Sequence, residues 1–412
     1  MVKFKGYEFI DGGVCAAKGF KAGGVIAGIK AGNTTKRDLA MIVCSERCKA
    51  AALFTTNKVK GAPIIVSKEH LADGYAQAVI VNSGNANTCN PDGVEIANEM
   101  CVLAAKELGI GADDVLIGST GVIGQKLRIE PIAVKIPALV QLLSEDGSSL
   151  ACEAIMTTDT RKKEFAVEFD LGGKKCHVGG ISKGSGMINP NMATMLAFIT
   201  TDVNINGELL QKALRKVNSI TYNMVSVDGD TSTNDTLILM SSGLAGNNEI
   251  ICEDKNYEVF ENALFAVMMN LARETARDGE GATKLIECVV NGAPNEDTAK
   301  KVAKSVISSS LVKAALFAAD ANWGRILCAI GYTDAEFDIN SVSVELASSK
   351  GKITVCVDGA GIDFSEETAA QILSEEEIKI LVDLHSGCDG SAVAWGCDLT
   401  FEYVKINAEY RT

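Results

Sequence analysis

A glycine-rich loop that runs directly into an apolar segment is the feature that most limits how this chain can fold. The loop begins at Lys183-Gly-Ser-Gly and continues through the rigid turn Asn189-Pro190-Asn191, after which residues 195–199 are all apolar. A short apolar run bounded by turn residues is typical of a buried strand. Thr194 therefore lies where a turn meets a strand of the core. A hydroxyl group held there is well placed to attack the carbonyl group of Ala193 just before it.

Length and composition describe a globular chain with room for two lobes. The 412 residues exceed what one hydrophobic core usually holds. With 47% apolar and 22% charged residues, the chain is neither disordered nor fibrous. A net charge of −14 without a Lys/Arg run argues against nucleic acid and anionic membranes as partners. We expect a cytoplasmic protein, because the N-terminus lacks the apolar core of a signal peptide and the apolar runs are too short to span a bilayer.

Cysteine and histidine spacing gives no metal-binding pattern. The 13 cysteines contain no Cys-x-x-Cys pair, and the three histidines lie far apart. We expect the cysteines to be reduced core residues. The acidic run at 228–235 resembles a calcium loop only superficially, because it lacks the spaced terminal Glu. We therefore expect no metal and no bound cofactor.

Apolar periodicity predicts strands that alternate with helices along the whole chain. The predicted strands cover residues 78–81, 115–118, 164–169, 174–181, 195–199 and 236–240, followed by the pairs 342–346 with 352–357 and 393–399 with 402–406. The predicted helices cover residues 93–108, 207–217, 257–277 and 297–319. This mixture predicts an α/β or mixed α+β body of layered sheets flanked by helices, rather than a barrel or a bundle.

A chemical role for Thr194 is favoured because the chain offers it no histidine as a base. Most threonines at such a junction are merely strand formers, but the three histidines lie in unrelated contexts and predict no triad. A free α-amine has a pKa of about 7.7–8.0, so roughly a tenth of it is neutral at pH 7, against less than about a thousandth of an ordinary lysine. Cleavage of the Ala193–Thr194 bond would place this base and the hydroxyl nucleophile on one residue.

Two further segments are candidates for binding. The turn at 118–124, Gly-Ser-Thr-Gly-Val-Ile-Gly, lacks both common phosphate-loop patterns, so a plain turn is a better interpretation than a phosphate site. Beside a nucleophile, its backbone N–H groups could form an oxyanion hole, where each donor typically contributes about 2.7–4 kcal/mol. The acidic turn at 277–284 could bind an amine or simply be solvated.

Motifs along essentially the whole chain resemble those of the ornithine acetyltransferase family of arginine biosynthesis. The cleavage motif is Asn189-Pro-Asn-Met-Ala-Thr-Met-Leu-Ala-Phe198. The other motifs occur in the family's order: Asn82-Ser-Gly-Asn-Ala-Asn87, Ser119-Thr-Gly-Val-Ile-Gly124, Ala154-Ile-Met-Thr-Thr-Asp159, Asp228-Gly-Asp-Thr231, Asn322-Trp-Gly-Arg325 and Ala394-Trp-Gly-Cys-Asp398. Members of this family are self-cleaving glutamate N-acetyltransferases with N-terminal-nucleophile-like architecture.

The resemblance implies an α fragment of residues 1–193 and a β fragment of residues 194–412, forming two lobes. It makes Thr194 the nucleophile, Ala193–Thr194 the cleaved bond, and Thr120 with Gly121 the oxyanion hole. The implied substrate-binding residues are Thr157, Lys183, Thr194, Glu280, Asn407 and Thr412, with Thr158 as an alternative to Thr157.

The reaction that the resemblance implies is ping-pong transfer of an acetyl group from N-acetylornithine to glutamate through acetyl-Thr194. Lys183 would bind the carboxylate that both substrates share, and Glu280 would face the amine of ornithine. The family also implies a heterotetramer of two α and two β fragments, and some members use acetyl-CoA as a second acetyl donor. A self-processing aminopeptidase and a non-catalytic two-lobed amino-acid-binding protein are the alternative functions.

Overall fold

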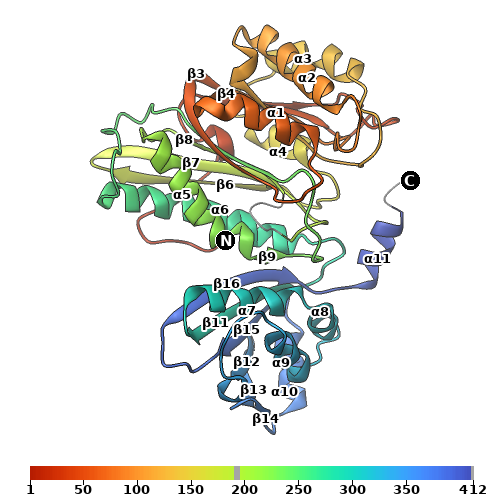
Figure 1. Ribbon diagram of the computed structural model, residues 1–412, viewed down its shortest axis with the longest axis vertical. Helices are drawn as coiled ribbons and strands as arrows, with labels where there is room; N and C mark the ends of the chain where they lie inside the picture. The colour runs from red at the N-terminus through yellow and green to blue at the C-terminus, as the bar shows by residue number, and fades with distance from the viewer. Residues whose placement is uncertain (190–194, 410–412) are drawn as a thin grey trace. The chain divides into compact units, whose positions relative to one another are not determined.

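The computed structural model describes residues 1–189 and 195–409. The chain divides into two units, and each is described by itself (Figure 1). Unit 1 comprises residues 1–184, 191–219 and 231–271, and unit 2 comprises residues 185–190, 220–230 and 272–412. None of the described helices is long and apolar enough to cross a membrane.

Unit 1 is built on a nine-stranded sheet. The strand order is β1-β6-β7-β8-β10-β3-β4-β5, and β2 pairs with β3 beside this path. The strands are β1 (Glu8–Ile10), β2 (Phe20–Val25), β3 (Leu39–Phe54), β4 (Tyr75–Asn82), β5 (Val115–Ser119), β6 (Lys163–Leu171), β7 (Lys174–Lys183), β8 (Leu196–Thr201) and β10 (Thr236–Ser241). The pairs β8–β10 and β4–β5 are parallel, and the other pairs are antiparallel.

Helices cover both faces of this sheet because its strands are apolar on both sides. Val79 and Val81 of β4 belong to one buried cluster, whereas Ala78 and Ile80 belong to another. Such continuous apolar strands are expected in a sheet that is buried on both faces. The helices are α1 (Ala62–His70), α2 (Gly93–Leu108), α3 (Glu130–Gln141), α4 (Ser148–Ile155), α5 (Gly207–Ser219) and α6 (Lys255–Arg277), with short 3₁₀ helices at Gly13–Cys15, Leu71–Asp73 and Ala112–Asp114. Residues 272–277 of α6 belong to unit 2.

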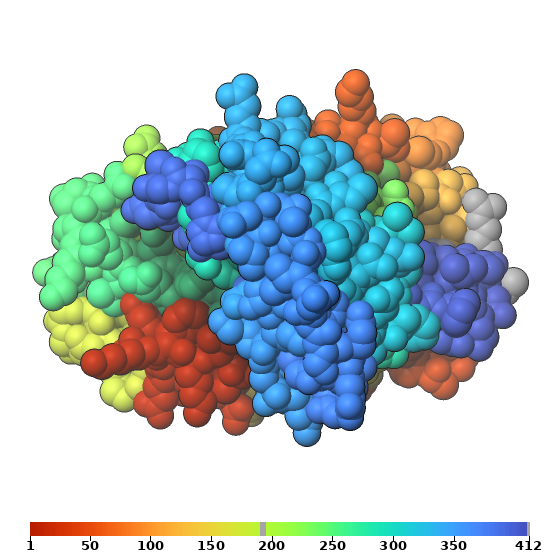
Figure 2. Space-filling view, turned by 90° about the horizontal axis from the view of Figure 1, so that it is seen from below, coloured from red at the N-terminus to blue at the C-terminus, as the bar shows by residue number. Residues whose placement is uncertain are grey.

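Unit 2 contains a seven-stranded sheet with the order β14-β13-β12-β15-β11-β16-β9. The strands are β9 (Val225–Ser226), β11 (Leu285–Ala293), β12 (Ser343–Ser348), β13 (Gly351–Val357), β14 (Ala360–Gly361), β15 (Glu377–Asp383) and β16 (Gly390–Cys397). Its helices are α7 (Glu296–Ser308), α8 (Ser310–Phe317), α9 (Trp323–Gly331), α10 (Glu366–Leu373) and α11 (Phe401–Ala408), with 3₁₀ helices at Tyr222–Met224 and Ile339–Ser341. Figure 2 views the end of unit 2 that carries β13, β14 and α10, whose surface is formed by the blue C-terminal third of the chain.

The structure confirms the predicted fold class of layered sheets flanked by helices, and most predicted elements with it. The helix predicted at 93–108 is α2, and Gly109 ends it in a left-handed conformation with φ of 72°. The strands predicted at 164–169 and 174–181 form the hairpin β6–β7. The apolar segment after the glycine-rich loop forms β8, which is buried along its whole length.

Two predictions near the C-terminus were wrong. The single helix predicted at 297–319 is two helices, because Ser309 is extended and its side chain accepts the Val312 N–H at the start of α8. The strand predicted at 402–406 belongs to α11. Its expected partner β16 already pairs with β11 on one side and with β9 on the other. The segment at 402–406 therefore cannot pair with β16 as a strand, although its residues alternate.

Candidate active site

Two polar turns meet where the parallel strands β4 and β5 end. The side-chain amide of Asn82 donates to Ser119 Oγ at 2.7 Å, and its backbone carbonyl accepts the Thr120 N–H at 2.9 Å. The side-chain carbonyl of Asn82 accepts the N–H groups of Gly84 at 3.2 Å and Asn85 at 3.0 Å. One fully buried amide therefore fixes both turns.

Gly121 is required by the close approach of these turns. Its φ is 131°, which residues with a side chain rarely adopt, and a Cβ there would lie 2.8 Å from the Asn85 nitrogen. The Ala86 N–H donates to the Val122 carbonyl at 3.2 Å and holds the two segments together. The backbone around Gly121 is thus held by the close approach of the two turns and by this hydrogen bond.

Lys183 lies at the end of β7 and contacts the second turn. It is 7% exposed, and it pairs with Leu196, the first residue of β8. Its Nζ donates to Thr120 Oγ1 at 3.3 Å. Because this oxygen accepts from an ammonium group, the hydroxyl hydrogen of Thr120 is directed to another acceptor. The structure thus brings together Lys183 and Thr120 at the start of β8.

Asp159 is a buried carboxylate that organises the same region. Its Oδ1 accepts from Lys163 Nζ and from the Gly184 N–H, each at 2.7 Å, and its Oδ2 accepts from the Thr157 N–H at 2.9 Å. Burial alone would raise the pKa of Asp159, but the charges of Lys163 and Lys183 outweigh it and hold the pKa well below its usual range. Asp159 is therefore ionised and links Thr157 to the residue that follows Lys183.

Thr157 and Thr158 are both partly exposed. The carbonyl of Thr157 accepts a hydrogen bond from Lys36 Nζ. Burial lowers the pKa of Lys36, although the Asp159 carboxylate opposes this change. The geometry does not distinguish the two threonines, and Thr157 remains an expected substrate contact.

Glu280 and Asn407 lie together in unit 2. Glu280, in the turn after α6, is 7% exposed, and its Oε2 accepts the side-chain amide of Asn407 on α11 at 2.8 Å. The Glu280 N–H donates to the Ser185 carbonyl at 3.0 Å. A Cβ at Gly186 would lie 2.4 Å from the Glu280 carboxyl group, so glycine is required there. Two residues that are far apart in sequence therefore form one polar cluster.

Asp228 holds the glycine-rich loop from within unit 2. Its carboxylate accepts the N–H groups of Met187 at 2.6 Å and Ile188 at 2.9 Å, and the hydroxyl of Tyr403 at 3.3 Å. Burial and the charge of Asp228 raise the pKa of Tyr403 above its usual range. Within residues 1–189 and 195–409, no group of three or more His, Cys, Asp or Glu side chains is arranged to hold a metal ion.

The predicted nucleophile and two other predicted site residues fall outside the described residues. These are Ala193, Thr194 and the C-terminal Thr412. The adjacent residue Met195 is buried and has a φ of 155°, an uncommon value for a residue with a side chain. Its carbonyl accepts the Thr236 N–H at 2.8 Å.

Sequence reasoning assigned no role to the buried pair of Asp159 and Lys163. The one available signal was a carboxylate four residues before a lysine, directly after two threonines of a family-like motif. Such spacing is common on solvated surfaces. Only the packing of unit 1 shows that both side chains of the Asp159–Lys163 pair are buried.

Comparison with known proteins identifies the family. A model of the ArgJ family matches residues 21–412. The protein named arginine biosynthesis bifunctional protein ArgJ 1 from Clostridium acetobutylicum is 49% identical over 394 residues, 95% of this chain and 96% of its own length. The protein named glutamate N-acetyltransferase from Methanocaldococcus jannaschii is 47% identical over 411 residues, 98% of this chain and 99% of its own.

A solved structure of arginine biosynthesis bifunctional protein ArgJ from Bacillus halodurans is 46% identical and has a TM-score of 0.49, covering 51% of this chain and 97% of that chain. The family match and the two relatives extend over nearly the whole sequence. The chain is therefore an acyltransferase that belongs to the ArgJ family.

Proposed function

We propose that this enzyme transfers the acetyl group of N-acetylornithine to glutamate, and that its nucleophile is Thr194 freed by cleavage of the bond before it. The relative named glutamate N-acetyltransferase supports the reaction. The observation that carries the site is the 3.3 Å contact of Lys183 with Thr120, because Lys183 pairs with Leu196 at the start of β8. In the chain, a single residue, Met195, separates Leu196 from Thr194.

The donors available to an oxyanion follow from the hydrogen bonds of the second turn. The Thr120 N–H is already donated to Asn82, so Thr120 offers its hydroxyl group, and Gly121 offers its N–H. The ammonium group of Lys183 polarises the Thr120 hydroxyl and makes it a better donor. Loss of one oxyanion donor usually lowers kcat about 10²–10³-fold.

The chemistry proceeds in two halves. The Thr194 hydroxyl oxygen attacks the acetyl carbonyl of N-acetylornithine, and the α-amine of Thr194 takes the hydroxyl proton and passes it to the departing ornithine nitrogen. Glutamate then attacks acetyl-Thr194 with its neutral amine. The acetyl group leaves as N-acetylglutamate, and the Thr194 hydroxyl is restored.

Substrate recognition divides between the shared and the differing ends of the two amino acids. Lys183, together with Thr157 or Thr158, binds the α-carboxylate that ornithine and glutamate share. The buried carboxylate of Glu280, held by the Asn407 amide, supplies the charge that complements the side-chain amine of ornithine. Thr412 contributes from the C-terminus.

Cleavage would leave two fragments that share one sheet. Strands β8 and β10 of fragment 194–412 lie between β7 and β3 of fragment 1–193, so backbone hydrogen bonds keep the fragments together. The proposed assembly has two copies of each fragment and works in the cytoplasm. Acetyl-CoA is the proposed second acetyl donor, and no other cofactor is needed. Light scattering coupled to size-exclusion chromatography measures the assembly.

A denaturing gel combined with an acetyl-transfer assay tests the function. The native protein should give two bands, and Thr194→Ala should give one band near 43.4 kDa and no transfer. A single band for the active native protein refutes the self-cleavage. Acetate released without acetylated glutamate indicates the aminopeptidase-like hydrolase, and one band with ligand binding but no turnover indicates the binding protein.

A further inference from the structure

Asn234 connects the two polar turns of the site to the strand that pairs with β8. It lies two residues before β10 begins and is 5% exposed. Its side-chain nitrogen donates to the Ala86 carbonyl of the first turn, residues 82–87, at 2.5 Å. The same nitrogen donates to the Ser119 carbonyl, where the second turn of residues 119–124 begins, at 3.0 Å. One buried amide therefore binds both turns.

The hydrogen bonds of the Asn234 amide define its orientation. Its Oδ1 accepts the hydroxyl groups of Thr88 and Thr233, each at 2.6 Å. A backbone carbonyl can only accept, so the nitrogen must face the carbonyls of the two turns. A Cβ at Gly61 would lie 2.7 Å from both Nδ2 and Oδ1, so this glycine leaves room for the amide. A buried amide whose two hydrogens and whose oxygen are all bound holds its neighbours rigidly.

The contact with Asn234 fixes the peptide group that joins Ser119 to Thr120. Asn234 binds the carbonyl oxygen of this group, and its N–H, on Thr120, donates to the Asn82 carbonyl at 2.9 Å. A peptide group is planar, so binding both of its polar atoms fixes the direction in which the chain enters Thr120. The Thr120 hydroxyl and the Gly121 N–H follow directly after this group, and their positions depend on it.

Strand β10 connects this arrangement to the start of β8. The Thr236 hydroxyl donates to the Asn234 carbonyl at 3.0 Å, and the Thr236 N–H donates to the Met195 carbonyl at 2.8 Å. The two strands are parallel, with Leu196 opposite Thr236. Residues 234–236 therefore join the second turn to the start of β8 through hydrogen bonds within unit 1.

We propose that Asn234 is a positioning residue for acetyl transfer, which holds the Thr120 hydroxyl and the Gly121 N–H at a fixed place relative to β8. This inference rests on the proposed function, because it needs the second turn to bind the oxyanion. Asn234 acts through the Ser119 carbonyl, since both hydrogens of its amide are already donated to the turns. A displacement of about 1 Å in such a site can lower the rate about 10²-fold.

Asn234→Ala tests this role by removing the amide. We expect kcat to fall about 10²-fold while KM for N-acetylornithine and for glutamate stays native. The reason is that oxyanion donors act on charge that forms only in the transition state, so their displacement lowers kcat and kcat/KM together. The value of kcat is expressed per cleaved chain, from the bands of a denaturing gel, so that slow cleavage is not counted as slow transfer.

Asn270→Ala is the matched control. Asn270 on α6 is 1% exposed, and its Nδ2 donates to two backbone carbonyls, those of Val2 at 3.0 Å and Ala266 at 2.9 Å. Neither acceptor belongs to a polar turn of the site. The two alanine variants should lose similar amounts of thermal stability, but kcat per cleaved chain should stay native in Asn270→Ala.

Hydrogen exchange followed by mass spectrometry gives a measurement that does not depend on turnover. Peptides from residues 82–87 and 119–124 should exchange faster in Asn234→Ala than in the native protein. The same peptides should exchange at the native rate in Asn270→Ala. This comparison shows whether Asn234 holds the turns, whatever reaction the enzyme catalyses.

The outcomes separate this inference from the proposed function. A native enzyme that transfers no acetyl group to glutamate refutes the function. If the native enzyme is active, then a native kcat in folded and cleaved Asn234→Ala, or an equal loss of kcat in both alanine variants, overturns the positioning role alone.

Thr88→Val decides if Asn234→Ala does not fold or is not cleaved. This variant keeps the amide and removes only one of the hydroxyl groups that hold it. It should lower kcat about 3–10-fold at native KM, as expected for the loss of one hydrogen bond. A native kcat in Thr88→Val overturns the positioning role.

Discussion

Replacing Lys163 by methionine is expected to destabilise unit 1 by about 3 kcal/mol. Both side chains of the pair with Asp159 are 0% exposed, and Lys163 Nζ lies 2.7 Å from Oδ1. Removing one partner of a buried ion pair usually costs about 3–5 kcal/mol, because the other charge stays buried. We expect a cost at the low end of this range, because Lys183 still faces Asp159 and the N–H groups of Gly184 and Thr157 still donate to it.

Thermal unfolding followed by circular dichroism measures this change. Tryptophan fluorescence is unsuitable, because Trp323 and Trp395 both belong to unit 2. A loss of about 3 kcal/mol lowers the melting temperature of a domain this size by about 6–12 °C. Adding Asp159→Asn to Lys163→Met should recover much of the loss, because the buried charge is then removed.

Lys162→Met is the matched control for this prediction. Lys162 is the exposed neighbour that donates to Ser149 Oγ at 2.9 Å, and its loss should change stability by less than about 0.5 kcal/mol. The pH dependence of the protein's stability gives a second check of the role of Asp159. The pKa of Asp159 is lowered on folding, so its stabilisation is present above about pH 4 and is lost as pH falls through the folded pKa. The reasoning is refuted if Lys163→Met and Lys162→Met melt at the same temperature.

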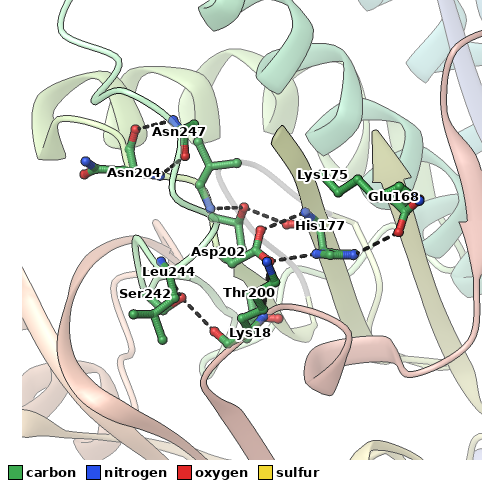
Figure 3. Close-up of polar contacts among 12 residues, drawn as sticks. Lys18, Glu168, Lys175, His177, Thr200, Asp202, Asn204, Ser242, Leu244 and Asn247 are labelled. Atoms are coloured by element: carbon green, nitrogen blue, oxygen red, sulfur yellow. Dashed lines mark hydrogen bonds and ion pairs between the residues drawn. The ribbon is translucent and has the colours of Figure 1, made fainter. Parts of the chain in front are cut away.

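His177→Gln is expected to remove pH-dependent stability near neutrality, because hydrogen bonds to Asp202 and to Glu168 raise the pKa of His177 (Figure 3). The stabilisation is complete below about pH 6.5 and is lost as pH rises through the higher folded pKa, so melting curves at pH 6 and 9 should converge in the variant; an unchanged difference contradicts this. Gly121→Ala should cost about 1–3 kcal/mol through its backbone strain and should lower transfer at least about 10-fold, because its Cβ would lie 2.8 Å from the Asn85 nitrogen. Native melting and turnover in this variant would show that the turn adapts.

Elements whose signals are local could be predicted from the sequence. The helix at 93–108 and its end at Gly109 need only periodicity and one glycine, and the β6–β7 hairpin needs only alternation around a Gly-Gly turn. The segment at 402–406 failed because alternation alone does not say whether a partner strand has a free edge. The helix predicted at 297–319 is interrupted because Ser309 caps the start of α8, and an apolar pattern does not reveal such a cap.

The sequence by itself determined the junction at Thr194, the shortage of histidine bases and the family-like motifs, because each is a property of neighbouring residues or of composition. Only the tertiary structure decided which groups stand around that junction. Lys183 contacts Thr120 across 63 residues of chain, and it stands beside Leu196 at the start of β8 through strand pairing. It also decided that Asp159 is charged, because the pKa of a buried carboxyl group depends on its burial and on its distance from a cation.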